Sequence, residues 1–267
     1  MSLPFIATMA ALLYFVAAGL QSFSILQHNQ QTSRMLVITT LLALGCHTIA
    51  AWGAIASDGD GIHFGFYRSA APIFLAINII CLTAILVRRP LQNLLLIIFP
   101  LSAIAVLVSS FGPQTDRNHG AMDPGILLHV VASILAYAVL TLAAIQAALV
   151  AIQDSQLRHH RTRGIVRLLP PLQLMESMLF ELLWAGVLLL SVAIAAGFLF
   201  VDDLFAQHLV HKTVLTIIAW FIFSVLLWGH YQLGWRSQTA VRLTLGGFVT
   251  LMLAFFGSKL VLELILH

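Results

Sequence analysis

Eight long apolar runs divide this chain and decide what it can fold into. Each comes close to the roughly 20 residues that an α-helix needs to cross a hydrocarbon core about 30 Å thick. Only 9% of the residues are charged and 60% are hydrophobic, with a mean hydropathy of +0.99. The runs cover about 3–26, 35–56, 69–87, 93–111, 126–151, 176–201, 211–229 and 240–262. We expect an all-α, polytopic membrane helix bundle of about eight spans, built as a single integral membrane domain over residues 1–267.

The arginines between these runs predict the orientation of the chain. Cytoplasmic loops are enriched in Lys and Arg, and most of the arginines fall in alternate connections: Arg34, Arg88, Arg89, Arg158, Arg161, Arg163, Arg167, Arg236 and Arg242. The opposite connections are mainly acidic. The first run has no basic segment before it, so we expect a retained span rather than a signal peptide. The arginine side is therefore predicted to be cytoplasmic, with both termini outside and no nucleic-acid partner implied by the basic pI.

Familiar catalytic motifs are missing from the sequence. It contains no HExxH, Walker loop or Ser/His/Asp constellation, which leaves hydrolytic and nucleotide-driven chemistry without support, and we expect no enzyme. Cys46 and Cys81 lie in apolar runs without CxxC spacing and are interpreted as packing residues. The absence of CxxCH means that any haem would be bound non-covalently, as haem b.

Histidine is abundant, with 11 residues, and most lie on the predicted outer side. His129 opens the fifth run, where Ser133 and Tyr137 follow on the same helical stripe, so this polar face should look into the bundle. His211 opens the seventh run at the same depth. Two facing imidazoles can take both axial positions of a haem iron. The alternative is that each histidine bonds a carbonyl or a water at a helix end.

Two further histidines lie deeper in the membrane or on its cytoplasmic side. His47 stands near the middle of the second run, and an ionisable residue there is a functional hypothesis by default. Its alternative is a neutral ring that bonds across helices. His230 ends the seventh run as a ligand or as a cap on the last carbonyls. Glu176 and Glu181 are expected to begin the sixth helix, where the macrodipole favours them.

Four segments together resemble one known family. They are HVVASILAYAVL at 129–140, LPPLQLMESMLFELLWAGVLLLSVAIAAG at 169–197, HKTVLTIIAWFIFSVLLWGHYQLGWR at 211–236 and LAFFGSK at 253–259. These resemble the cytochrome c assembly protein family of the CcsA/CcmC type, and within it the YpjD-like inner-membrane branch. The resemblance is best over 126–267. It implies a membrane protein that binds or relays haem during cytochrome c biogenesis.

The resemblance also implies roles for individual residues. In the family, an outer pair of histidines holds haem over a tryptophan-rich loop, and some members add a pair within the membrane. His129 matches the first outer histidine, His47 matches the first intramembrane one, and His230 lies within two residues of the second. Here FLFVDDLFAQHLVHKT, residues 198–213, replaces the tryptophan-rich loop, and Lys212 keeps the position of a family lysine. The second outer histidine has only His267 as a counterpart.

We therefore expect His129 and His211 to ligate the haem iron and Lys212 to meet a propionate as a point charge. The expected partners are haem, the lipid bilayer, and cytochrome c maturation proteins or other membrane proteins. The alternatives are a non-haem accessory or scaffold subunit with structural histidines, and a transporter that uses His47 as its polar site. A Soret band would separate the first reading from the other two.

Overall fold

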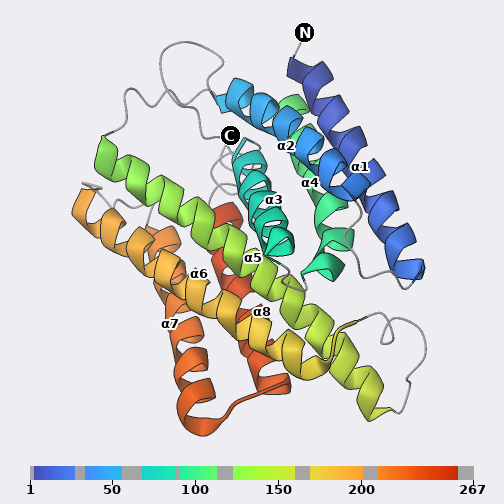
Figure 1. Ribbon diagram of the computed structural model, residues 1–267. Coiled ribbons are helices and arrows are strands. Elements are labelled where there is room, and N and C mark those ends of the chain that lie inside the picture. The colour runs from blue at the N-terminus through green and yellow to red at the C-terminus, as the bar shows by residue number, and fades with distance from the viewer. Residues whose placement is uncertain are drawn as a thin grey trace. The chain divides into compact units, whose positions relative to one another are not determined.

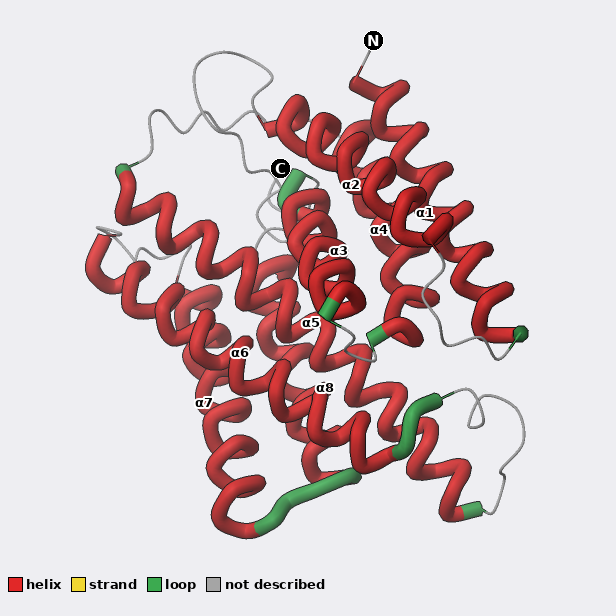
Figure 2. Tube along the Cα trace, viewed as in Figure 1, coloured by secondary structure: helices red, strands yellow, loops and turns green. Residues whose placement is uncertain are grey.

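The computed structural model describes residues 3–27, 34–55, 68–87, 91–112, 123–159, 169–200 and 210–257 (Figures 1 and 2). Over these ranges the chain is helical and contains no β-strand, which confirms the all-α prediction. The chain divides into two compact units, Met1–Met122 and Asp123–His267. Each unit contains four of the described α-helices.

The first unit consists of α1 (Leu3–Leu26), α2 (Arg34–Ile55), α3 (Ala70–Leu86), the 3₁₀ turn η1 (Gln92–Leu94) and α4 (Leu95–Phe111). Helices α1 and α3 each contact both α2 and α4, so the four helices close into a ring. Buried alanines on α1, among them Ala10 and Ala17, let the neighbouring backbones come close. Tyr14 and Phe99 fill the interior, with ring centroids 5.9 Å apart.

The second unit consists of α5 (Pro124–Arg158), α6 (Leu172–Phe200), α7 (Val210–Leu233), α8 (Gln238–Met252) and the π-helical segment η3 (Leu253–Gly257). Helix α5 contacts α6 and α8, while α7 contacts α6, α8 and η3. Successive helices run antiparallel, so the start of α5, the end of α6, the start of α7 and η3 lie at one end of this unit.

Helices α5 and α6 lie side by side along much of their length (Figures 1 and 2). A glycine allows their close approach. A Cβ atom placed on Gly186 of α6 would lie only 2.5 Å from Cδ2 of Leu140 on α5. Any larger residue at position 186 would therefore push the two helices apart or displace the Leu140 side chain.

Seven of the described helices are long and apolar enough to cross a membrane, and α3, with 17 residues, is a shorter apolar helix. The eight helices match the eight predicted runs, apart from their ends. The predicted fifth span ended at 151, but α5 continues to Arg158 and has 35 residues. A helix of that length measures about 52 Å and exceeds a hydrocarbon core of about 30 Å. The extension is polar and contains an Asp154–Arg158 pair at 3.1 Å.

Candidate functional site

His129 lies in the second turn of α5, where Asp123 caps the helix by accepting a hydrogen bond from the Gly125 N–H at 2.8 Å. The His129 ring is half-buried, and its Nδ1 lies 2.7 Å from the carbonyl oxygen of Ala193 on α6. Because a carbonyl only accepts, Nδ1 carries the hydrogen, and in the neutral ring Nε2 keeps its lone pair. Metal-binding histidines commonly have one ring N–H anchored to a carbonyl in this way.

The polar stripe predicted below His129 faces inward, as expected. Ser133 is half-buried and Tyr137 is buried. The Tyr137 ring lies 5.5 Å from the ring of Phe255 in η3 and 5.9 Å from that of Phe248 on α8. The spacing of these three α5 residues therefore predicted the buried face correctly, while the aromatic partners on α8 and η3 carried no signal in the sequence.

Lys212 is the third residue of α7 and also faces this end of the unit. Its Nζ atom lies 5.6 Å from the centroid of the Phe255 ring. The side chain is half-buried. Within the described ranges, no carboxylate pairs with this ammonium group. His129, Lys212, Tyr137 and Phe255 together form what we call the His129 cluster.

His211 is exposed, although it immediately precedes Lys212. Consecutive residues on an α-helix point about 100° apart, so only one of the two can face His129. The structure places the Lys212 ammonium over Phe255, whose ring contacts Tyr137 on the same stripe as His129, and leaves His211 exposed. His208 and His267 lie outside the described residues.

His47 is fully buried in the first unit, with 0% of its surface exposed. Its Nε2 lies 3.1 Å from the Ala71 carbonyl oxygen on α3, and its Nδ1 lies 2.9 Å from the Tyr14 hydroxyl on α1. Since the carbonyl requires a donor, Nε2 donates and Nδ1 accepts from Tyr14 in the neutral ring. The Tyr14 ring meets the imidazole edge-on at 89°. Both ring nitrogens are thus engaged, and His47 links α1, α2 and α3.

His230 belongs to the second unit and lies near the end of α7. Its Nδ1 is 2.8 Å from the carbonyl oxygen of Trp235 in the α7–α8 turn, so Nδ1 donates and Nε2 keeps the lone pair. The ring stacks on Phe180 of α6, with centroids 3.4 Å apart. His230 thus stabilises the turn that follows its helix. Its acceptor lies two residues beyond the end of α7, whereas the sequence predicted one of the last carbonyls of the helix.

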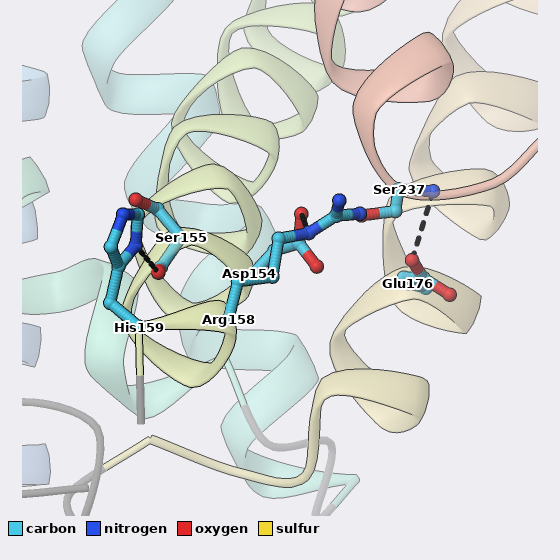
Figure 3. Close-up of polar contacts among 6 residues, drawn as sticks. All are labelled: Asp154, Ser155, Arg158, His159, Glu176 and Ser237. Atoms are coloured by element: carbon cyan, nitrogen blue, oxygen red, sulfur yellow. Dashed lines mark hydrogen bonds and ion pairs between the residues drawn. The ribbon is translucent and has the colours of Figure 1, made fainter. Parts of the chain in front are cut away.

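Polar contacts gather at this same end of the second unit (Figure 3). Arg158 donates to Asp154, and the ring of His159 donates to the Ser155 carbonyl oxygen at 2.7 Å. Glu176 accepts a hydrogen bond from the backbone N–H of Ser237, in the α7–α8 turn, at 3.0 Å (Figure 3).

The macrodipole explanation for the two glutamates of α6 is wrong. This helix begins at Leu172 and has no acidic residue in its first turn. Glu176 lies beyond that turn and binds the α7–α8 turn instead, and Glu181 lies deeper still. The predicted start at 176 left out the first four residues of the helix, Leu-Gln-Leu-Met at 172–175.

The eight helices and their buried polar residues define the class: a multi-pass helical membrane protein. The chain belongs to the cytochrome c assembly protein family, whose model, described as Cytochrome C assembly protein, matches residues 2–266. It is 34% identical over 264 residues to the inner membrane protein YpjD of Escherichia coli K12, covering 98% of this chain and 100% of that relative. It is also 26% identical over 272 residues to an uncharacterized 28.8 kDa protein in a nifR3-like 5′ region of Azospirillum brasilense, covering 100% of both chains. No solved structure matches.

The family raises the question of whether the residues present fit a haem. Within the described ranges, no group of three or more His, Cys, Asp or Glu residues could hold a bare metal ion. Haem needs fewer protein ligands, because the porphyrin supplies four nitrogens and the protein adds only axial donors. The Nε2 lone pair of His129 fits such a donor, and the ammonium of Lys212 fits a propionate. The His129 cluster therefore suits this group.

Proposed function

We propose that this chain is a haem-handling protein of the bacterial inner membrane that binds haem b non-covalently near the outer face. The observation that carries the proposal is the 2.7 Å hydrogen bond between His129 Nδ1 and the Ala193 carbonyl oxygen. This bond fixes the ring and its tautomer before any ligand arrives, so that Nε2 is ready to coordinate. Family membership supports a haem-handling role in general, and the geometry of His129 supports this particular site.

Each residue of the site has a distinct task in this proposal. His129 would hold the haem iron through Nε2, and Lys212 would pair with a propionate through its ammonium group. His211 is the proposed second ligand, but its exposed ring does not face His129 in this structure, so it would have to turn toward the iron from the start of α7. Bound haem would supply a redox-active iron within a planar apolar ring that carries two carboxylates. The chain itself orients this group and shields it from water, and it performs no hydrolytic chemistry.

Two observations support a location in the inner membrane. The relative from Escherichia coli is named as an inner membrane protein, and the helices of this chain are apolar over membrane-spanning lengths. The arginine asymmetry then favours both termini outside, with His129 and Lys212 at the outer end of the second unit.

One observation favours a second candidate, a non-haem accessory or scaffold subunit with structural histidines. His47, a family-implied ligand, has both nitrogens engaged within its own unit. In the accessory reading, His129 would likewise serve only to join α5 to α6 through the Ala193 carbonyl.

The deciding experiment is an absorption spectrum of the purified protein after expression with adequate haem. We expect a Soret band of low-spin, bis-imidazole type for the wild type. The His129→Ala variant should lose haem or become high-spin, and added imidazole should restore the low-spin form. His159→Ala is the matched control, since His159 caps the C-terminal end of the same helix and also bonds a backbone carbonyl. No Soret band in the wild type, or an unchanged one in His129→Ala, would favour the accessory candidate.

The second ligand needs a separate measurement. If His211 ligates the iron, His211→Ala should give the same high-spin shift as His129→Ala, again reversed by imidazole. A low-spin spectrum in His211→Ala that disappears in His267→Ala or His208→Ala would instead assign the second position to one of those histidines.

A further inference from the structure

Phe255 joins two residues of the His129 cluster. Its ring lies 5.5 Å from the Tyr137 ring, and the Lys212 ammonium lies 5.6 Å from its centroid. It belongs to the π-helical segment η3, and such segments occur frequently at functional sites. Phe248 also contacts Tyr137, but the ammonium lies over Phe255. The face of one particular aromatic ring is therefore covered by a cation.

Within the part of the chain that the structure describes, the Lys212 ammonium has an aromatic ring as a partner but no carboxylate. The side chain is half-buried at the start of an apolar helix. Charged groups in such places are normally paired. An aromatic face attracts an ammonium, but a carboxylate forms a stronger, charge-assisted hydrogen bond with it. A ligand carboxylate should therefore draw the Lys212 ammonium away from Phe255 and leave that ring face uncovered.

We propose that Phe255 is the aromatic platform of the site and that Lys212 covers it until a ligand carboxylate takes the ammonium. The inference rests on the proposed haem function and adds a rule of ligand selection to it. The site would admit a planar aromatic ligand that carries a carboxylate and would disfavour the same ring system without one. Phe255 then provides the flat apolar contact that residues 198–213 lack the tryptophans to provide.

The platform is tested by titrating haem into the apoprotein in detergent and following the Soret band. Phe255→Leu, which keeps an apolar side chain but removes the ring, should weaken haem binding by about three- to tenfold, as expected for one lost ring–ring contact. Phe255→Trp should bind at least as tightly as the wild type. Phe248→Leu is the matched control, since it also loses a ring contact with Tyr137, and its affinity should stay at the wild-type value. Equal weakening in Phe255→Leu and Phe248→Leu would overturn the platform.

The cover is tested by comparing haem with its dimethyl ester, which has no free carboxylate. Lys212→Met should bind haem more weakly than the wild type, because the propionate loses its partner. The same variant should bind the ester about threefold more tightly than the wild type, because the cation–π contact no longer has to be broken. An ester affinity that is unchanged in Lys212→Met would show that Lys212 only binds carboxylate, and the cover would be refuted.

The two proposals fail in different ways. If the wild type binds neither haem nor its ester, the haem function fails, and the platform fails with it. If the wild type binds haem through His129 while Phe255→Leu and Lys212→Met leave the affinities for haem and ester unchanged, only the platform and its cover fail.

Discussion

His47 and His129 lie in different units of the chain, and both donate a hydrogen bond to a backbone carbonyl of a neighbouring helix. They differ at the other ring nitrogen. In His47 this nitrogen accepts the Tyr14 hydroxyl within a fully buried network. In the half-buried ring of His129 it keeps a lone pair beside a lysine that has no carboxylate partner within the described ranges. The depth of a histidine in the membrane is therefore a poor guide to whether it can bind a ligand, and the state of its second nitrogen is a better one.

The largest expected effect concerns orientation, since a reversed chain would put the His129 cluster on the cytoplasmic side. Reporter fusions after Arg34, Arg89 and Arg167 should score as cytoplasmic, and a fusion after Arg117 should score as periplasmic. Helix α3 is the sensitive element, because its 17 residues span only about 26 Å. A periplasmic signal after Arg167 would remove the outer placement of His129.

The second largest effect is expected in the haem content of variants at the two histidines. We expect His129→Gln to lower the haem-to-protein ratio by more than about tenfold, because losing a ligand should cost at least as much as losing a supporting residue. His47→Gln should keep the wild-type ratio, because glutamine can accept from Tyr14 and donate to the Ala71 carbonyl. Pyridine haemochrome analysis of the purified variants measures both. Loss of haem from a folded His47→Gln protein would indicate that His47 is also a ligand, and the proposed difference between the two histidines would be wrong.

For the stability of the fold, we expect His47 to matter more than His129. His47→Leu leaves the buried Tyr14 hydroxyl without its acceptor and removes the bond to the Ala71 carbonyl, so we expect it to lower the free energy of unfolding by about 2 kcal/mol. His129→Leu in the apoprotein breaks one hydrogen bond at a half-buried position and should cost about 1 kcal/mol or less. Unfolding by SDS in mixed micelles gives both values. A cost for His129→Leu that matches or exceeds that of His47→Leu would mean that His129 has the larger structural role.

The smallest effect tests the Tyr14–His47 bond itself. Tyr14→Phe keeps the ring contacts and removes only the hydroxyl, with an expected cost of about 1 kcal/mol. The Tyr14→Phe/His47→Leu double variant should cost less than the sum of the two single variants by about 0.5–1 kcal/mol, since both remove the same bond. The same unfolding assay measures this coupling. Strict additivity would show that the hydroxyl and the imidazole act independently.

Much of the fold could be predicted from the sequence because hydropathy measures what a membrane selects. The eight apolar runs coincide with the eight helices, and the His129–Ser133–Tyr137 stripe correctly indicated a buried face. The ends of the helices were predicted less accurately. Hydropathy reports where lipid ends rather than where hydrogen bonding ends, so it missed the polar turns of α5 up to Arg158.

The site was only partly predictable because contacts between helices depend on how each helix is rotated. His211 and Lys212 are neighbours in sequence, and packing alone decides that Lys212 faces Phe255. Tyr14 reaches His47 across 33 positions of sequence. Nothing in the α1 pattern distinguishes Tyr14 from any other buried aromatic residue. Glu176 and Ser237 meet for the same reason, because folding brings the start of α6 to the α7–α8 turn.

The glycine at position 186 also bears on the electronic character of His129. Ala193, which accepts the His129 hydrogen bond, lies seven residues further along α6, about 10 Å from Gly186. A shorter bond to that carbonyl makes the imidazole a stronger electron donor, and a longer one makes it weaker. The spacing of α5 and α6 thus acts as a tuning element for the donor strength of His129. Gly186→Ala brings a methyl group against the end of the Leu140 side chain, so either that side chain shifts or the helices separate; separation would lengthen the His129–Ala193 bond and weaken His129 as an electron donor without altering any residue that touches the ring.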